Sequence, residues 1–385
     1  MRHESSTFCV PDYLFDDTIS AVLRPAWFHG MSPGVGVPSP GKSVTEERTI
    51  MATRFGLLLP HFGTEASQDL LIEGAQLAER LGLDSLWVRD HLVFHPHGME
   101  GTDRTFIEPF VTLAFLAGVT TSIGLGTATV IPFRHPINLA YSVASLGWIT
   151  RRRLDLGIGS GTFDHEFDVI GMGDADRPAL MIEQLEIMRG LWAGGTIEHH
   201  SPTYDFADVD LKPGFTSPPP IWWGGGTPAS TRLAVDFCDG WLPGRITFPT
   251  YEKRVHQIRE RCEEQGRAMI KVGAVPITSI GSTSEAALAN LNQAGLIKNA
   301  NNQRFWLKPE SGEFQTMADL DGSVLFGTPA EVARGVDRYL EIGADLLIFD
   351  FRFRFVDWLE QIETLVSEVL PRVGATAPSV PRRMA

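Results

Sequence analysis

The segment Pro220-Ile221-Trp222-Trp223-Gly224-Gly225-Gly226-Thr227-Pro228 joins an apolar run to three glycines in a row and to a helix expected at 229–238. The apolar run is typical of a strand in a parallel sheet that is covered on both faces. Because the glycines carry no side chains, backbone N–H groups at this turn can approach a ligand, and the helix would direct its positive end to the same place. This combination favours a phosphate site. The alternative is that the glycines only form a tight turn.

Strand and helix patterns alternate on both sides of this segment, from residue 53 onward. Strands are expected at 54–60, 85–88, 123–130, 153–161, 220–224, 240–243, 272–280 and 345–350. Helices are expected between them at 68–81, 109–119, 137–149, 177–191, 229–238, 251–265 and 329–342. Eight such units predict an α/β protein with a (β/α)8 fold, the TIM barrel, whose chemistry lies at the C-terminal ends of the strands. The rival is a doubly wound dinucleotide-binding fold. That fold would place Gly-x-Gly-x-x-Gly after the first strand, where this chain reads Leu-Pro-His-Phe-Gly.

Two stretches within the barrel are too long to be plain loops. They are 163–176 with 197–217, and 282–326, and we expect them to be insertions that cover the C-terminal mouth and shape a substrate pocket. Residues 1–50 show no periodicity, so we expect a poorly ordered N-terminal extension before the barrel domain at 51–374. Met51 directly precedes the first strand, and the natural chain could begin there. Residues 375–385 are expected to form a flexible tail.

The composition excludes several classes of function. The 385 residues carry a net charge of −14, whereas a protein that binds nucleic acid is normally basic. The cysteines Cys9, Cys238 and Cys262 have neither the spacing of metal ligands nor that of a disulfide framework, so no metal site is expected. No apolar run reaches the roughly 18 residues of a membrane span, and the N-terminus lacks the layout of a secretory signal. We therefore predict a cytoplasmic protein with a small-molecule substrate.

Five groups of short motifs connect the chain to a known family. They are Ser-Leu-Trp-Val-Arg-Asp-His at 85–91, Leu-Gly-Thr at 125–127 with Pro-Phe-Arg-His-Pro at 132–136, Arg-Leu-Asp-Leu-Gly-Ile-Gly-Ser-Gly at 153–161, Ile-Trp-Trp-Gly-Gly-Gly at 221–226, and Asp-Gly-Trp at 239–241. Together they resemble the bacterial luciferase-like superfamily of flavin-dependent oxidoreductases. The resemblance implies a (β/α)8 barrel that binds either reduced FMN or the deazaflavin coenzyme F420. Many FMN members are two-component monooxygenases that receive reduced flavin from a separate flavin reductase, whereas deazaflavin members move hydride without oxygen. Members are commonly homodimers or homotetramers.

The resemblance also implies which residues hold the cofactor. The glycine turn supplies the phosphate site, the third strand ends in a bulge with a non-proline cis bond behind the flavin ring, and the fourth strand lines the cofactor. The residues concerned are Gly225, Gly226 and Thr227, then Thr127, Ala128 and Thr129, and finally Gly159 and Ser160. The alternatives are an ordinary end of the third strand and packing of the fourth strand against a helix.

Three residues are catalytic candidates. Asp90 and His91 end the second strand, and an imidazole there could transfer a proton or donate to the flavin, because its pKa lies near neutrality. The alternative is a structural histidine held by Asp90. Arg134 follows the third strand and would reach flavin or substrate, unless it pairs with an acid such as Glu108.

Four residues near the expected mouth are substrate candidates: His61, His95, Arg177 and Arg352. The two arginines would hold an anionic substrate, with surface salt bridges as the alternative, and the histidine after the first strand could instead hold a loop. Glu166, after the fourth strand, is either a base or a partner of Arg153.

At three places the sequence departs from the patterns of related enzymes, and these departures bear on whether the chain is an FMN-dependent or a deazaflavin-dependent enzyme. His95 and Thr162 stand where deazaflavin-dependent sugar-phosphate dehydrogenases have a tryptophan and a glutamate, so that particular hydride chemistry is not expected. Alkanesulfonate-type enzymes bear a cysteine soon after the first strand, which this chain lacks. The prediction is an FMN-dependent monooxygenase that oxidises a small organic substrate with O2. The alternatives are a deazaflavin-dependent oxidoreductase and, less favoured, a non-catalytic flavin-binding relative.

Overall fold

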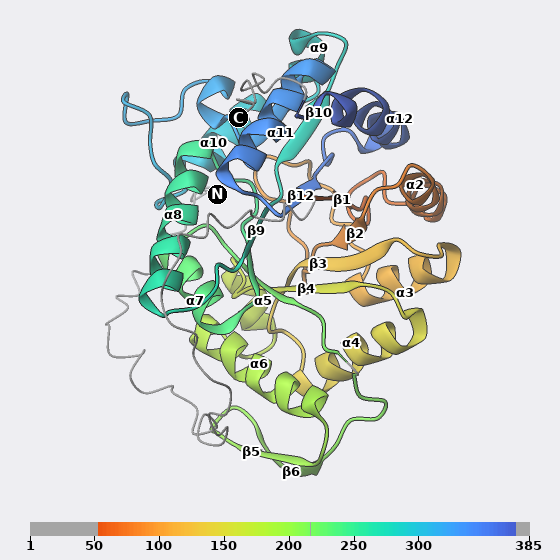
Figure 1. The fold of residues 1–385 in the computed structure, drawn as a ribbon, viewed down its shortest axis with the longest axis vertical. Coiled ribbons are helices and arrows are strands. Elements are labelled where there is room, and N and C mark those ends of the chain that lie inside the picture. Colours follow the sequence, from red (N-terminus) through yellow and green to blue (C-terminus); the bar gives the residue numbers. More distant parts are fainter. Residues whose placement is uncertain (1–52, 216, 375–385) are drawn as a thin grey trace, which may run out of the picture. The chain divides into compact units, whose positions relative to one another are not determined.

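Eight parallel strands close into a barrel in the order β1-β12-β9-β8-β7-β4-β3-β2, which confirms the predicted TIM barrel (Figure 1). The computed structural model describes residues 53–215 and 217–374, so the predicted extension at 1–50 and the tail at 375–385 lie outside the described residues. The barrel strands are β1 (Arg54–Leu58), β2 (Ser85–Val88), β3 (Gly124–Val130), β4 (Leu154–Ile158), β7 (Ile221–Gly224), β8 (Gly240–Leu242), β9 (Lys271–Ala274) and β12 (Leu346–Phe349). Because every neighbouring pair is parallel, all C-terminal strand ends meet at one mouth.

Helices follow the barrel strands and surround them (Figure 1). They are α2 (Gln68–Arg80), α3 (Pro109–Val119), α4 (Pro136–Thr150), α6 (Arg177–Ala193), α7 (Pro228–Phe237), α8 (Phe248–Glu264), α11 (Pro329–Ile342) and α12 (Trp358–Thr364). Side-chain caps define the first turns of most of these helices, since a capping atom satisfies an N–H without a partner in the helix. Ser67 accepts from the N–H of Leu70 at the start of α2, and Thr328 forms a capping box with Glu331 at α11. The helix α12 completes the alternation and is not among the predicted helices.

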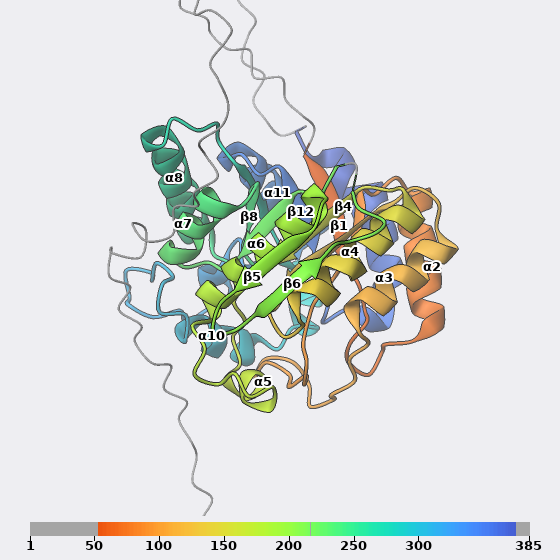
Figure 2. The same cartoon turned by 90° about the horizontal axis from the view of Figure 1, so that it is seen from below.

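Both long stretches contain secondary structure of their own. The first holds α5 (Asp164–Val169) and the antiparallel hairpin β5 (Ile197–His200) with β6 (Asp205–Val209), which lies beside α6 (Figures 1 and 2). The second holds α9 (Ser284–Ala289), α10 (Gln293–Asn301), a 3-10 turn (Met317–Leu320) and β11 (Val324–Gly327). Figure 2 shows α5 and α10, one from each insertion, at the same end of the barrel. Asn292 donates to the carbonyl of Met99 (3.0 Å), so the second insertion reaches the segment that follows β2.

One predicted strand is in fact two strands. The stretch 272–280 divides into β9, in the barrel, and β10 (Ile277–Ile280), which pairs with β11 in a separate two-stranded sheet. Pro276 stands at the division, and a proline has no N–H for a strand ladder. The residues on both sides of the division are buried and include β-branched side chains, so the residue pattern did not reveal the break. Short turns complete the C-terminal part at Phe355–Asp357, Leu365–Val369 and Leu370–Arg372.

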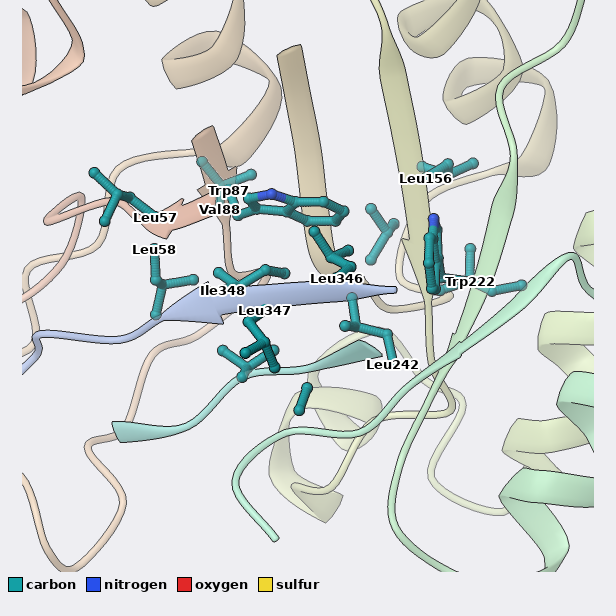
Figure 3. Packing of buried hydrophobic residues seen from close by; sticks show 14 of the residues in the cluster. Leu57, Leu58, Trp87, Val88, Leu156, Trp222, Leu242, Leu346, Leu347 and Ile348 are labelled. Atoms are coloured by element: carbon teal, nitrogen blue, oxygen red, sulfur yellow. The ribbon is translucent and has the colours of Figure 1, made fainter. Parts of the chain in front are cut away.

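Indole rings fill the barrel interior against glycines of neighbouring strands (Figure 3). Trp87 and Trp222 are completely buried. A Cβ atom at Gly126 would lie 2.5 Å from the ring of Trp87, and one at Gly240 would lie 2.4 Å from the ring of Trp222. The small residues are therefore required by the packing of the large ones.

The N-terminal end of the barrel contains a buried carboxylate. Asp155 accepts from the two terminal nitrogens of Arg54 (2.8 and 3.1 Å) and from the indole N–H of Trp222 (3.0 Å). These residues open β1, β4 and β7, so the interaction joins three strands at the end opposite the mouth.

Candidate active site

The predicted cofactor and catalytic residues come together at the C-terminal mouth of the barrel. Residues 89–91 directly follow β2, residues 159–160 follow β4, and residues 225–227 follow β7. Since these strands are parallel members of one closed barrel, the glycine turn lies at the same end as Asp90 and Ser160.

The glycine turn bonds to the protein through its carbonyl oxygens and leaves two of its N–H groups open. Gly225 accepts from the indole N–H of Trp241 (2.8 Å), and Gly226 accepts from Nε of Arg254 (3.0 Å). Within the described part of the chain, the backbone N–H groups of Gly226 and Thr227 find no acceptor. Open N–H groups at the start of a helix fit a phosphate group.

The backbone at this turn requires a glycine and ends in a capped helix. Gly225 has a φ of +96°, and a Cβ atom there would lie 2.6 Å from Oγ of Ser230. Thr227 caps α7 by accepting from the N–H of Ser230 (3.0 Å). The positive end of α7 therefore begins at the turn.

Arg254 of α8 is buried behind the turn and forms no ion pair with the residues that the structure describes. Besides its bond to Gly226, it donates to the carbonyl of Phe305 (2.7 Å) in the second insertion. Burial lowers the pKa of Arg254. Its uncompensated charge adds to the helix end in favouring an anion. The sequence reasoning missed Arg254, although an arginine on the buried face of a helix was a signal.

The end of β3 forms the bulge that the resemblance implies. The register with β4 shifts within 127–130, and the Ala128–Thr129 peptide is cis. The side chain of Thr129 then fills space beside the neighbouring strands: a Cβ atom at Gly159 would lie 2.7 Å from its Oγ1. The absence of a side chain at Gly159 is thus required by Thr129 of the neighbouring strand rather than by packing against a helix. Ser160 is half-buried beside it at the mouth.

His91 links Arg89 to Glu166. Nη2 of Arg89 donates to Nε2 of His91 (3.2 Å), which leaves the ring proton on Nδ1, 3.3 Å from both oxygens of Glu166. Two backbone N–H groups at 92–93 also donate to Glu166. Burial lowers the pKa of His91 although Glu166 raises it, so the ring is neutral at pH 7. The predicted pairing of Glu166 with Arg153 is wrong, because Arg153 lies at the other end of β4.

Asp90 and Arg134 form a clamp between the ends of β2 and β3. The carboxylate accepts from both terminal nitrogens of Arg134 (2.6 and 2.9 Å) and from the N–H of Ile131 (3.0 Å), and Arg134 also pairs with Glu108 (2.8 Å). These contacts argue against the catalytic roles predicted for Asp90 and Arg134. They also show that Asp90 is not the partner of His91.

A network of arginines and carboxylates lies beside His91. Glu100 accepts from Nη1 of Arg89 (3.2 Å) and pairs with Arg352, which also donates through Nε to Asp350 (2.6 Å). Burial alone would raise the pKa of Glu100, but the two guanidinium groups hold that pKa well below its usual range. Arg352 is therefore already paired with carboxylates of the protein, which argues against its predicted role in holding an anionic substrate.

His61 is also removed from the substrate candidates by its contacts. It is fully buried, with Nδ1 donating to the carbonyl of Ile107 (2.9 Å) and Nε2 accepting from the N–H of Arg89 (2.9 Å). Burial lowers the pKa of His61 to about 3. Both ring nitrogens serve the backbone, so the alternative of a loop-holding histidine fits the structure.

The last two substrate candidates lie on the first insertion or face it. Arg177 pairs with Asp164 (2.5 Å) and covers the ring of Phe167, so its charge is already matched. His95 is half-buried and contacts the ring of His165. Only His95 of this pair stays a candidate for substrate contact.

A cavity of about 480 Å³ lies at the opposite end of the barrel. Trp192 of α6 lines this cavity, together with residues at the starts of β7, β8 and β9: Pro219, Trp222, Asp239 and Lys271. Chemistry in TIM barrels takes place at the C-terminal strand ends, so we do not place the active site there.

The sequence profile of the luciferase-like monooxygenase family matches residues 53–346, which span the barrel from β1 to the start of β12. The chain belongs to this family. Membership in the luciferase-like family confirms the predicted superfamily and, with it, a flavin-dependent oxidoreductase.

Curated relatives of this luciferase-like chain include both flavin-dependent and F420-dependent enzymes. The oxygenase component of the flavin-dependent trigonelline monooxygenase of Acinetobacter baylyi is 28% identical over 328 residues, which are 79% of this chain and 89% of that protein. The F420-dependent hydroxymycolic acid dehydrogenase of Mycobacterium tuberculosis is 30% identical over 192 residues, which are 49% of this chain and 51% of that protein.

Solved structures from both branches share the luciferase-like fold. The monooxygenase RslO1 from Streptomyces bottropensis is 22% identical, with a TM-score of 0.67 over 83% of this chain and 99% of that chain. The F420-dependent tetrahydromethanopterin reductase from Methanopyrus kandleri is 19% identical, with the same TM-score over the same shares. In the described ranges, no helix is long and apolar enough to cross a bilayer, and no three His, Cys, Asp or Glu side chains gather as metal ligands.

Proposed function

We propose that this luciferase-like chain is the oxygenase of a two-component monooxygenase that uses reduced FMN and O2 to oxidise a small organic substrate. The observation that carries the proposal is the turn at 225–227, with open N–H groups at the start of α7 and Arg254 buried behind them. These groups would hold the FMN phosphate. When bound, reduced FMN would supply the activation of O2.

The trigonelline monooxygenase component of Acinetobacter baylyi, which aligns over most of its own length and of this chain, supports the two-component arrangement. It is described as the oxygenase component of a flavin-dependent monooxygenase, and it covers 79% of this chain. By analogy, a separate flavin reductase would supply reduced FMN to the present chain, which would work as a homodimer or homotetramer in the cytoplasm.

His91 is the residue that we propose for proton transfer. Its proton is fixed on Nδ1 toward Glu166, and its Nε2 is shared with Arg89. A neutral imidazole can accept a proton at Nε2 if Arg89 turns fully to Glu100, and Glu166 would then stabilise the imidazolium. The second insertion, tied to the mouth through Phe305 and Asn292, would limit the access of water.

Oxygen consumption tests this proposal. The full chain would be supplied with FMN, NADH, a flavin reductase and a broad panel of organic compounds. We expect substrate-dependent O2 uptake above that of the reductase alone, and a product that carries one oxygen atom from labelled O2. The His91→Ala variant should lower this rate by about a hundredfold or more, with FMN binding retained. Equal rates for wild type and His91→Ala would remove the proton-transfer role.

Deazaflavin-dependent hydride transfer is the second candidate. It is favoured by the F420-dependent relatives, one of which, a glucose-6-phosphate dehydrogenase of Gordonia bronchialis, is 26% identical over 72% of this chain. Titrations with oxidised FMN, reduced FMN and coenzyme F420 would compare the two candidates directly. Tighter binding of F420, together with no substrate-dependent O2 uptake, would replace the monooxygenase by the hydride-transferring enzyme.

A further inference from the structure

One arginine at the mouth has no acidic partner. Arg245 follows β8 and forms no ion pair with any residue in the described ranges. Its guanidinium donates to the amide oxygen of Asn299 in the second insertion (3.3 Å). The residue is half-buried beneath that insertion.

Arg245 faces a cluster that is already rich in arginine. In the ring of eight strands β8 lies opposite β2, and the electrostatic neighbours of Arg245 are Arg89 and Glu100 after β2 and Asp350 and Arg352 after β12. Burial lowers the pKa of Arg245 to about 9, and the two other guanidinium groups act in the same direction. Three arginines thus share two carboxylates, and both carboxylates are bonded to the other two arginines. Among the described residues, Arg245 is the arginine of this group that bonds to neither carboxylate.

The histidines of the mouth add no positive charge, and the bonds of Glu166 go to groups other than Arg245. Burial lowers the pKa of His97 to about 3 and also lowers the pKa of His91, so neither ring adds charge at pH 7. Glu166 is held by His91 and by two backbone N–H groups. No bond joins Glu166 to Arg245 in the described ranges, so the guanidinium of Arg245 can still pair with the carboxylate of a ligand.

Aromatic side chains border the same region. The ring centroid of Phe163 lies 5.0 Å from that of His97 and 5.7 Å from that of His91, and the ring of Phe106 lies 5.3 Å from that of His91. Both phenylalanines are half-buried. A ligand in this place would meet apolar surface together with one unpaired cation.

We propose that the substrate is a small organic acid whose carboxylate binds Arg245 and whose apolar part contacts these aromatic rings. The inference rests on the proposed function, since it names the substrate class of that site. An unpaired, poorly solvated cation is unfavourable without a ligand, and a carboxylate matches the planar guanidinium through two parallel hydrogen bonds. The phosphate of the cofactor is the other possible source of the anion, and the experiment separates the two.

Calorimetric titration tests the proposal with defined probes. The full chain, loaded with whichever of oxidised FMN or F420 it binds, is titrated with benzoate and hexanoate and with their neutral amides, benzamide and hexanamide. We expect at least one acid to bind about tenfold or more tightly than its amide, R245M to lose this preference, and R245K to keep part of it. R177M, which removes an arginine already paired with Asp164, should leave the preference unchanged. Equal binding of acid and amide by the wild type, or a preference that survives in R245M, would overturn the proposal.

Two further measurements, of flavin binding and of urea unfolding, test whether Arg245 binds the substrate carboxylate. R245M should bind FMN and riboflavin as the wild type does, and a selective loss for FMN would assign Arg245 to the cofactor phosphate instead. The urea midpoint of ligand-free R245M should equal or exceed that of the wild type, because an unbalanced cation is removed; a lower midpoint would make Arg245 a structural residue and overturn the proposal. None of these measurements uses O2. If acid binding is retained without oxygenation, the monooxygenase is disproved while the anion site stands.

Discussion

The two ends of the barrel use arginine in different ways. At the N-terminal end, Asp155 is matched by Arg54 and approached by Arg153, and water reaches both arginines, whose side chains are 16% and 41% exposed. At the mouth, the side chains of Arg352 and Glu100 are only 6% and 10% exposed, and Arg245 adds a cation that no carboxylate matches. We infer that the first end serves stability and that the second is prepared for an anionic ligand.

The largest expected effect lies at the N-terminal end. Asp155→Asn leaves Arg54 facing a neutral group, and removing one partner of a buried ion pair typically costs about 3 kcal/mol of unfolding free energy. Urea unfolding would measure this loss, and FMN affinity should not change. The control is Asp205→Asn, which removes an exposed partner of His200 and should leave stability unaltered. A fully stable Asp155→Asn protein would contradict the structural role of this end.

The next effect is expected at the glycine turn. Gly226→Asp places a carboxylate beside the proposed phosphate site, so FMN affinity should fall by about a hundredfold or more in a fluorescence titration. The nearest atom to a Cβ there is Cδ1 of Ile246, at 3.2 Å, the tip of a flexible side chain, so we expect the fold to tolerate the change. Gly226→Ala is the matched control, with a small effect. Undiminished FMN binding by Gly226→Asp would place the phosphate elsewhere.

The buried histidine His61 should make stability depend on pH. Its pKa is about 3 in the folded chain and about 6.5 in an unfolded one, so the unfolded state binds a proton that the folded state does not. Its contribution is complete above pH 6.5 and is lost toward pH 3, by roughly 1.4 kcal/mol per pH unit. His61→Gln should therefore flatten the stability profile between pH 6.5 and 5 by about 2 kcal/mol. His256→Gln, on the exposed face of α8, is the control. Parallel profiles for wild type and His61→Gln would show that His61 is not kept neutral by burial.

The smallest expected effect concerns the charge behind the turn. Arg254→Met should weaken FMN binding about tenfold and leave riboflavin binding unchanged, because only FMN carries a phosphate. Arg261→Met, on the same helix but paired with Asp236 (2.5 Å), is the control and should change neither affinity. Equal losses for FMN and riboflavin would mean that Arg254 only shapes the turn.

The barrel could be predicted from the sequence because most of its strands and helices carry a local signal, although α12 was missed. The capped start of α7 after an apolar strand is one example, and it also located the proposed phosphate turn. The division between β9 and β10 could not be predicted from such local signals, since the second half pairs with a strand more than forty residues later.

The charge pattern of the mouth was much harder to predict. Arg352 and Arg245 look alike in the sequence, and only the fold brings Glu100, more than two hundred residues distant, to the first of them. In the same way, the partner of His91 is Glu166 rather than the adjacent Asp90. Neutralisation of a charge depends on contacts between distant segments, so residue type alone identified candidates and not their roles.

The pairing of β10 with β11 has a consequence for how such proteins diversify. The two strands form a sheet of their own, separate from the eight-stranded ring, and the helices α9 and α10 lie between them in the chain. Grafting a different module between Pro276 and Gly327 would leave the register of the eight-stranded ring untouched. The shape of the entrance, and with it the range of compounds admitted, can therefore change during evolution without redesign of the underlying scaffold.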